Sequence, residues 1–251
     1  MRKHLGLVIF SLLFCARSAE SQQQGILFVN RADPTGGGQA PCSTKIQDAV
    51  DAAQPGNIVR IQAGTYPEQV AIEKNKFSNA TEFDRIVIEA DPTLQPGQVV
   101  LTGVPGPQCT DKWAIQLKQS KFVTIRGLTI TGTGGQAISL MGGNNSNQEI
   151  HIELNRIFGN GSSSCNGGIT IARGNPGTLI VNNLLYANGR NGITFADADG
   201  GPHNVINNTI YGNQWNGIDV ARNHIVTIAN NIINKNGTAA GSTVSRFGVR
   251  I

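Results

Sequence analysis

Short apolar runs, cut by asparagine and glycine, recur through the second half of the chain. Four runs begin on an asparagine, and successive asparagines are 28, 25 and 23 residues apart. These asparagines are Asn155, Asn183, Asn208 and Asn231. A second set of runs begins on a glycine and continues with apolar residues at alternate positions, starting at Gly168, Gly192, Gly217 and Gly248. A repeat of this length is typical of a solenoid, and the runs are too short for helix pairs. The pattern therefore predicts an all-β fold, a parallel β-helix of stacked coils.

The asparagine that opens each run is predicted to form the turn between two strands. Asparagine tolerates left-handed backbone geometry better than other residues that carry a Cβ, and stacked asparagines can hydrogen-bond along the stack. In one coil we expect strands at 204–207, 209–212 and 217–221, with a turn at Asn208 and a loop at 213–216. Alternate residues of each strand should point inward. A low-complexity Asn/Gly linker is the alternative, and the regular apolar positions argue against it.

Upstream, residues 43–54 predict one α-helix. An apolar stripe runs along it, Ser43 or Thr44 can cap it, and Pro55-Gly56 ends it. Because an open coil end exposes a core and strand edges, we expect this helix to cover the first coil. Strands then begin at Ile58, and regular coils should run from about 113 to 251. The chain stops at Ile251 within a coil, from which we expect either a truncated product or an end covered by a partner.

Residues 1–21 are predicted to be a secretory signal peptide. Basic residues precede an apolar run from Leu5 to Phe14, which is too short for a comfortable membrane span, and small residues follow it. The mature chain, 22–251, would form one domain and be secreted, periplasmic or at the cell surface. Removing the signal takes away three basic residues and one acidic residue, so the net charge falls from +4 to about +2. A nearly neutral chain without a basic stripe does not favour a nucleic-acid partner.

Three cysteines remain after the signal: Cys42, Cys109 and Cys165. An exported protein can oxidise them. Cys42 lies just before the predicted helix and Cys109 in the loop that enters the first regular coil, so we expect these two to pair and Cys165 to stay free. Three unpaired cysteines are the alternative.

The N-terminal half resembles the opening of secreted right-handed parallel β-helix proteins of the pectin-lyase-like superfamily. The resemblance rests on Ile46-Gln47-Asp48-Ala49-Val50, Pro55-Gly56-Asn57, Ala63-Gly64-Thr65-Tyr66-Pro67-Glu68 and Ile86-Val87-Ile88-Glu89-Ala90. It covers nearly all of the mature chain and is closest to polysaccharide lyases of the pectate lyase 9 type. It implies a right-handed parallel β-helix and a polysaccharide that binds along the strand that follows the long loop. The scaffold also carries glycosidases, epimerases and adhesins, so the resemblance is less specific for activity.

If the coils stack in register, two ladders of outward side chains form along the strand that follows the long loop, which here is the run that begins on glycine. The first ladder comprises Ser139, Thr170, Thr194, Asp219 and Arg250. The second ladder stands two residues after the last inward residue of each strand and comprises Arg173, Asp197 and Arg222. Adjacent rungs lie about 4.8 Å apart. Asp197 should therefore lie between two arginines, and Asp219 beside Arg250.

These ladders suit the β-elimination of a uronic-acid polymer. The reaction needs the carboxylate neutralised, a base for the C5 proton and positive charge beside the enolate-like intermediate. We assign Arg222 as base or charge clamp, and Asp219 is the other candidate catalytic residue. Asp197, Asp199 and Asp219 are the candidate ligands for Ca²⁺. The candidate substrate-binding residues are Arg173, Thr194, His203, Trp215 and Arg250, with Asp199 and His203 in a loop that overhangs the same face.

Two comparisons with the family weaken the enzyme hypothesis. Pectate lyases of this type carry Asp-Asp-Gly-x-Asp in the calcium-binding coil, whereas this chain has Trp215-Asn216-Gly217-Ile218-Asp219. Mannuronan C5-epimerases carry Asp-Pro-His-Asp, and here only Pro202-His203 remains. Opposite charges on neighbouring rungs also stabilise a sheet without any substrate, and His203 and His224 can be solvated loop residues.

The sequence thus predicts a protein that acts on an acidic polysaccharide such as pectate or alginate. A pectate-lyase-like enzyme is the first hypothesis; a non-catalytic carbohydrate-binding or adhesion module and a uronate C5-epimerase are the alternatives. No transmembrane segment is expected, and the chain should be a monomer if it is complete.

Overall fold

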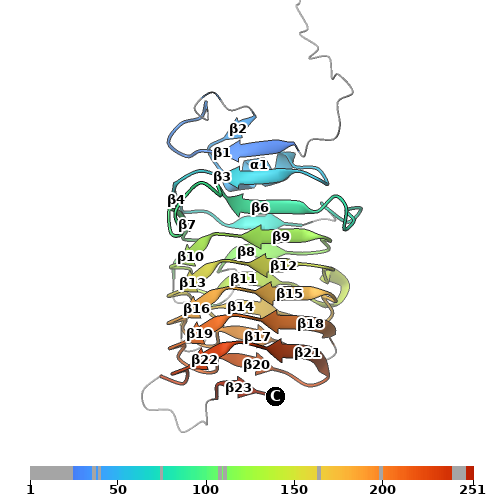
Figure 1. Ribbon diagram of the computed structural model, residues 1–251, viewed down its shortest axis with the longest axis vertical. Coiled ribbons are helices and arrows are strands. Elements are labelled where there is room, and N and C mark those ends of the chain that lie inside the picture. Colours follow the sequence, from blue (N-terminus) through green and yellow to red (C-terminus); the bar gives the residue numbers. More distant parts are fainter. Residues whose placement is uncertain are drawn as a thin grey trace, which may run out of the picture.

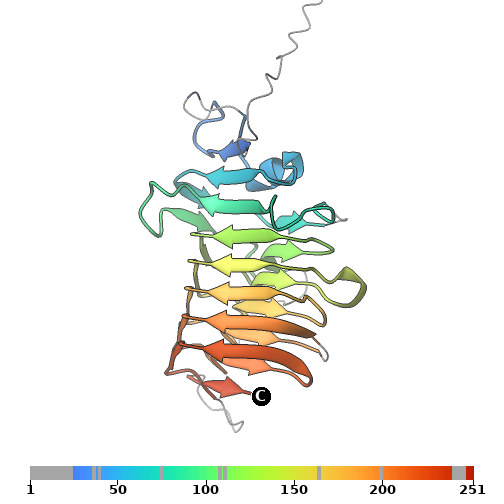
Figure 2. The ribbon, with the colours of Figure 1, turned by 45° about the vertical axis from the view of Figure 1, so that its right-hand side comes forward.

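The computed structural model describes residues 25–35, 38, 41–73, 76–106, 109, 112–162, 165–197, 200–238 and 247–251. The predicted signal peptide, 1–21, lies outside these residues. The described chain winds into a parallel β-solenoid with three long sheets, and each full coil gives one strand to each sheet (Figure 1). Turning the molecule shows the strands stacked coil upon coil (Figure 2).

All paired strands are parallel, and the strand order in each sheet follows the chain from coil to coil, except that β2 lies at the edge of its sheet beside β1. Sheet 1 contains β2 (Cys42–Ser43), β1 (Ile26–Val29), β3 (Ile58–Ile61), β6 (Ile86–Ala90), β9 (Val123–Arg126), β12 (His151–Glu153), β15 (Thr178–Val181), β18 (Gly200–Ile206) and β21 (His224–Ala229). Sheet 2 contains β4 (Gly64–Tyr66), β7 (Val99–Leu101), β10 (Thr129–Thr131), β13 (Arg156–Phe158), β16 (Leu184–Tyr186), β19 (Thr209–Tyr211) and β22 (Ile232–Asn234). Sheet 3 contains β5 (Val70–Ile72), β8 (Trp113–Leu117), β11 (Gln136–Leu140), β14 (Ile169–Ile171), β17 (Ile193–Phe195), β20 (Ile218–Val220) and β23 (Val249–Arg250).

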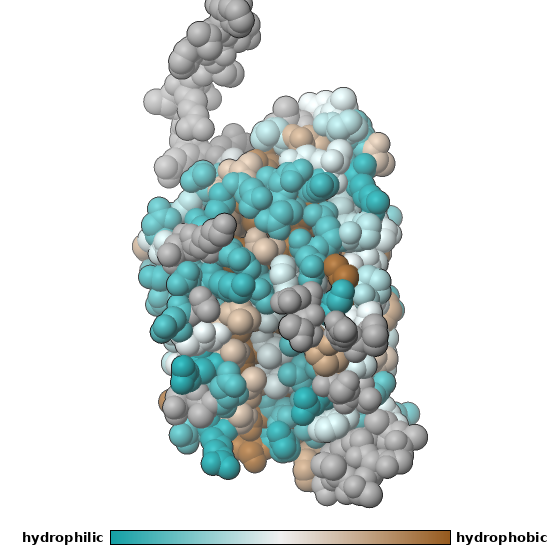
Figure 3. All heavy atoms as spheres, turned by 180° about the vertical axis from the view of Figure 1, so that it is seen from behind, coloured by the Kyte–Doolittle hydropathy of each residue, from teal (hydrophilic) through white to brown (hydrophobic). Residues whose placement is uncertain are grey.

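The core is a stack of aliphatic side chains inside the three sheets. On sheet 3 the inward residues stand in register from coil to coil and are fully buried, as in Ile138, Ile169 and Ile193. This is the arrangement that the alternating pattern predicts. The outer surface seen from behind is mostly hydrophilic, with a narrow vertical strip of apolar atoms (Figure 3).

The asparagine ladder is confirmed, but the repeated asparagine is not the left-handed residue. The left-handed residues are the ones just before the ladder, such as Asn182 and Asn207, with φ of 56° and 57°. Asn183 and Asn208 are instead buried. The Asn183 side-chain amide donates to the Asn208 side-chain oxygen at 3.0 Å and to the Ile152 carbonyl at 2.8 Å. The turn thus orients the next side chain into the stack, where it satisfies buried backbone groups.

A second ladder, which the sequence analysis did not identify, lies at the end of the sheet 2 strands. It comprises Asn160, Asn188, Asn213 and Asn236, joined by side-chain hydrogen bonds of 3.2, 3.0 and 2.8 Å.

The glycine that opens each sheet 3 run is required by the close approach of neighbouring coils. A Cβ on Gly168 would overlap the carbonyl oxygen of Gly192 in the next coil, so the coils approach too closely there for any side chain.

The predicted helix forms but is shorter than expected. Helix α1 spans Ile46–Ala52, buries Ile46, Ala49 and Val50, and contacts β1, β2, β3 and β5. The predicted capping by Ser43 or Thr44 is wrong, because Lys45 occupies the N-cap and makes no side-chain cap. The Glu68 carboxylate, from the first coil, instead accepts the free N–H groups of Ile46 and Gln47 at 3.0 and 3.1 Å.

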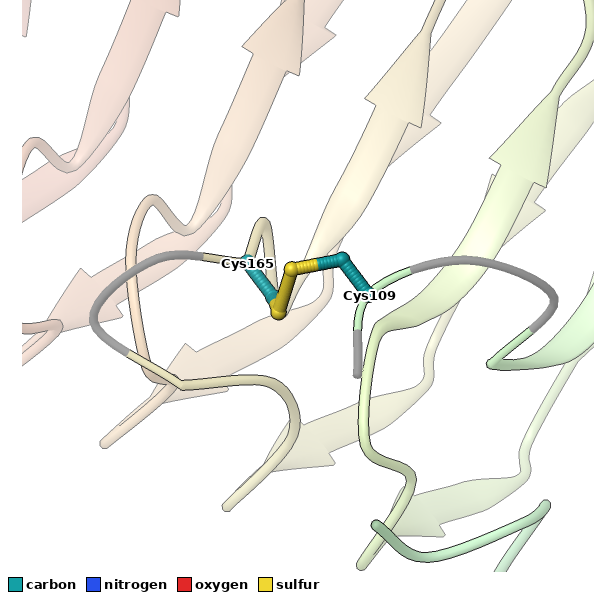
Figure 4. Close-up of a disulfide and its surroundings, with 2 residues drawn as sticks. All are labelled: Cys109 and Cys165. Atoms are coloured by element: carbon teal, nitrogen blue, oxygen red, sulfur yellow. A yellow bond between two sulfur atoms is a disulfide. The ribbon is translucent and has the colours of Figure 1, made fainter. Parts of the chain in front are cut away.

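The predicted disulfide is also wrong. Cys109 pairs with Cys165, and Cys42 is free (Figure 4). The two cysteines stand on loops that enter β8 and β14, two coils apart in the stack, and 56 residues separate them in the sequence. Within the described part of the chain, no helix is long and apolar enough to cross a membrane.

Candidate functional site

The outer face of sheet 3 carries the predicted first ladder in the predicted register. Ser139 pairs with Thr170, Thr170 with Thr194, Thr194 with Asp219, and Asp219 with Arg250. Gln116 extends the ladder by one rung. Although these side chains point away from the core, the rungs from Gln116 to Asp219 are no more than 9% exposed. They form a polar floor between the loops that flank the strands.

Asp219 is fully engaged by its neighbours. Arg250 donates from Nε to one carboxylate oxygen at 2.5 Å and from a terminal nitrogen to the other at 2.8 Å. The Asn191 amide donates to the second oxygen at 3.0 Å and to the Thr194 hydroxyl at 3.1 Å. Asp219 is 5% exposed, so this forked pair holds a buried charge in a fixed orientation. The predicted contact between Asp219 and Arg250 is confirmed.

A cavity of about 210 Å³ opens over this pair. We call it the Arg190 pocket, and its lining comprises Asn166, Arg190, Asn191, Thr194, Phe195, Ala196, Asp219, Ala221 and Arg250. The Asn166 side-chain oxygen and the Arg190 Nε are both buried, and neither has a hydrogen-bond partner among the described residues. Buried polar atoms without partners are uncommon, so a pocket that holds both a free donor and a free acceptor is suited to a polar ligand.

Arg190 lies against an aromatic ring rather than a carboxylate. Its guanidinium carbon is 4.5 Å from the centre of the Trp215 ring, and the Trp215 backbone N–H donates to the Arg190 carbonyl at 2.8 Å. The cation–π contact orients the guanidinium without neutralising it. Trp215, a predicted substrate-binding residue, is half-buried beneath Arg190 at the edge of the pocket.

The second outward ladder predicted on sheet 3, which comprises Arg173, Asp197 and Arg222, is only partly assembled. Arg173 and Asp197 line a neighbouring cavity of about 440 Å³ with Met141, Gly142, Gly143 and Ala172. Arg173, Asp197 and Arg222 are all exposed. Within the described ranges, no ion pair of 4.0 Å or less joins Asp197 to either arginine. The two arginines therefore remain available to an anionic ligand.

His203 does not lie in an overhanging loop. It belongs to β18, is 1% exposed and packs against the Phe195 ring at 4.9 Å between centroids. Its Nε2 faces His224 Nδ1 at 3.4 Å, and burial lowers the pKa of His203 to about 4, with a smaller contribution from His224. The expectation of a solvated, substrate-binding histidine is wrong, because the side chain points into the solenoid interior.

Among the described residues, the predicted calcium ligands Asp197 and Asp219 line different cavities. Both Asp219 oxygens already accept hydrogen bonds from Arg250 and Asn191, so little charge remains for a cation. Asp197 lines the other cavity, and Asp199 lies outside the described residues. In the described part of the chain no cluster of three or more acidic, histidine or cysteine residues is placed to hold a metal.

Sequence reasoning missed Arg190, Asn191 and Asn166, although a signal for the first was present. Arg190 and Trp215 each stand two residues before the glycine that opens a sheet 3 run, so register alone places them on adjacent rungs. Asn166 has no comparable signal. It follows Cys165, and only the disulfide shows why this loop lies against the pocket.

Comparisons with known proteins agree with this architecture. The family model described as "Right handed beta helix region" matches residues 112–250, which is more than half of the chain. No curated protein sequence matches the chain. The solved structures that resemble it include the GH136 lacto-N-biosidase from Eubacterium ramulus, with a TM-score of 0.58 and 14% identity over 79% of this chain. This chain spans only 43% of that enzyme.

Two further solved structures are similar over most of this chain. Pectate lyase Pel9A has a TM-score of 0.51 and 15% identity, covering 88% of this chain and 81% of its own. Rice weevil pectin methyl esterase has a TM-score of 0.51 and 14% identity, covering 85% of this chain and 67% of its own. At these identities the likeness shows the fold alone. Together with the family match, it shows that the chain belongs to the right-handed β-helix family and has a pectin-lyase-like architecture.

Proposed function

We propose that this protein binds an acidic polysaccharide along the outer face of sheet 3 and cleaves it by β-elimination. The observation that carries the proposal is the distribution of charge on that face. Arg173, Arg190 and Arg222 flank the polar ladder, and none of them forms an ion pair with another described residue. A shallow polar floor bordered by uncompensated arginines is complementary to a chain of carboxylates.

The named structural neighbours support a carbohydrate substrate. A pectate lyase, a pectin methyl esterase and a lacto-N-biosidase all use this scaffold, although none is closely related in sequence. Pectate and alginate, whose units carry a carboxylate at C5, are the polymers to test first.

In the proposed reaction Arg222 removes the proton at C5. The electrons of that C–H bond form a C4–C5 double bond, and the C4–oxygen bond breaks to release the leaving chain. Arg222 lies two residues beyond β20 and is exposed in the free protein, so a bound polymer must cover it before it can act as a base. Arg173 and Arg250 supply positive charge beside the developing enolate, and Asp219 keeps Arg250 oriented.

Removal of Arg222 tests the catalytic step. We expect Arg222→Ala to lower the rate of unsaturated-uronate formation by about 100-fold or more, as for loss of a general base. The measurement is the ultraviolet absorbance of the unsaturated product, with polygalacturonate and with alginate, each with and without Ca²⁺. Arg156→Ala is the matched control, because Arg156 is an exposed arginine on the outer face of sheet 2. Equal loss in both variants would reject Arg222 as the base.

A non-catalytic binding module is the second candidate, and the exposure of Arg222 favours it. Retained affinity for the polymer with no unsaturated product from the wild-type protein would support this candidate. The C5-epimerase alternative uses the same proton abstraction. It would be recognised by deuterium uptake at C5 with no double bond formed.

A further inference from the structure

We propose that the Arg190 pocket binds the carboxylate of one acidic sugar unit directly through Arg190, without a calcium ion between protein and substrate. This inference rests on the proposed function, and it concerns how the anion is recognised. It also assigns roles to Arg190 and Asn166.

The charge of the pocket favours an anion. The one carboxylate in its lining, Asp219, is held by both Arg250 donors and by Asn191. Arg190 has no carboxylate partner among the described residues, and its guanidinium rests on Trp215. The pocket therefore has one more positive charge than its acidic group neutralises, and a ligand carboxylate can supply the missing partner.

The unpartnered polar atoms match an acidic sugar in kind. Arg190 Nε is a donor, which a carboxylate oxygen can accept, and the Asn166 side-chain oxygen is an acceptor, which a sugar hydroxyl can satisfy. Both atoms are buried, so leaving them unpaired is costly and pairing them on binding recovers that free energy. Trp215 lies at the same edge and provides an apolar surface.

The size of the pocket limits the ligand to about one unit. Its volume of about 210 Å³ is below the roughly 300–1,000 Å³ of sites that enclose drug-sized molecules. The rest of the polymer would lie along the open ladder, past Thr170 and Ser139 toward the cavity that contains Arg173.

The sequence of this coil explains why an arginine takes the place of a metal. The two residues before Gly217 are the uncharged Trp215 and Asn216, and the one acidic residue of 213–221, Asp219, is committed to Arg250. On the preceding rung Arg190 occupies the position equivalent to Trp215. A Ca²⁺ ion next to Arg190 would meet a like charge without the carboxylates needed to offset it.

Calorimetric titration of the full chain with trigalacturonate, in the presence of a calcium chelator, tests the proposal. We expect the wild-type protein to bind under these conditions, and Arg190→Gln to weaken binding by about tenfold or more. Arg190→Lys should fall between the two, since it keeps the charge but loses the guanidinium fork. Arg156→Gln, which removes an arginine stacked on Tyr186 on another face, should bind as the wild type does. Methyl-esterified trigalacturonate should bind more weakly and lose its dependence on Arg190.

The outcomes separate this inference from the proposed function. Wild-type binding that Arg190→Gln leaves unchanged would overturn the Arg190 assignment and leave the proposed function standing. Binding that vanishes with the chelator and returns with Ca²⁺ would overturn it in favour of a metal site. Binding that depends on Arg190, with no unsaturated product, would reject β-elimination and support the pocket. Absence of binding to any acidic oligomer would reject both. Circular dichroism and melting temperature of each variant establish that it is folded.

Discussion

His203 lies in β18 of sheet 1 and Asp219 in β20 of sheet 3, and the direction of each side chain decides its role. His203 faces the interior against Phe195, whereas Asp219 faces the outer ladder and holds Arg250. Thr194 and Asn191 complete the hydrogen bonding around Asp219. The polar residues of the site thus support one another, and the arginines that have no such partner are the groups left to recognise a ligand.

The buried histidines predict loss of stability in acid. Burial lowers the pKa of His203 to about 4, with His224 facing it, and burial beside Arg85 lowers the pKa of His151 to about 4. Because the unfolded chain takes up these protons near pH 6.5, the free energy of unfolding should be highest above pH 6.5. It should fall toward pH 4 and level off below, by up to ~3 kcal/mol for the buried His203 and by less for the partly exposed His151, where solvent screens the charge.

Urea denaturation between pH 8 and pH 4 measures this effect. The variant His203→Phe replaces one of the two histidines by an uncharged aromatic residue. Its free energy of unfolding should fall less steeply as the pH is lowered. An unchanged slope in that variant would show that His203 is not the residue that resists protonation.

At the scale of elements, the two asparagine ladders hold the turns of successive coils together. Asn208 donates to the Ile180 carbonyl at 2.9 Å and to the Asn231 side chain at 3.0 Å, and it accepts the backbone N–H of Asn183 at 2.9 Å. The same side chain therefore serves three coils at once. Short strands of three residues, such as β16 and β19, rely on these lateral bonds because each has few backbone pairs of its own.

Removal of one ladder member should be costly. Asn208→Ala leaves several buried backbone and amide groups without partners, so we expect it to lower the free energy of unfolding by about 2–4 kcal/mol. Asn234→Ala is the matched control, since Asn234 is exposed in β22, and it should change stability by less than about 0.5 kcal/mol. Chemical denaturation of both variants gives the comparison, and similar losses would argue against the ladder as the cause.

For the whole molecule, the Cys109–Cys165 disulfide connects two loops that lie two coils apart in the stack. It joins the loops of Cys109 and Cys165 (Figure 4). Because Asn166 follows Cys165, the bond also ties down the part of the loop that lines the Arg190 pocket. The stability of the central coils and the shape of the pocket are therefore linked through one covalent bond.

Substitution of the disulfide should destabilise the protein and affect the pocket. Cys109→Ser with Cys165→Ser is expected to lower the free energy of unfolding by about 2–4 kcal/mol, because the unfolded chain gains freedom. Cys42→Ser, at the free cysteine, should have little effect. Thermal melting under non-reducing conditions distinguishes them, and peptide mapping without reduction should recover Cys109 and Cys165 in one linked fragment. A Cys42–Cys109 fragment would restore the pairing that the sequence suggested.

The local pattern of the sequence determined the solenoid, the strand positions and the outward ladder from Ser139 to Arg250. Those features depend on alternation along each strand and on a repeat that brings the same rung of each coil into register. Only the tertiary structure decided that His203 is buried, that Glu68 caps α1 from the first coil and that Cys109 pairs with Cys165. Each of these depends on loops whose length varies from coil to coil, so spacing along the chain does not give distance across it. The same reason applies to the Arg190 pocket. Only the folded coils show that Arg190 Nε and the Asn166 side-chain oxygen have no hydrogen-bond partner among the described residues.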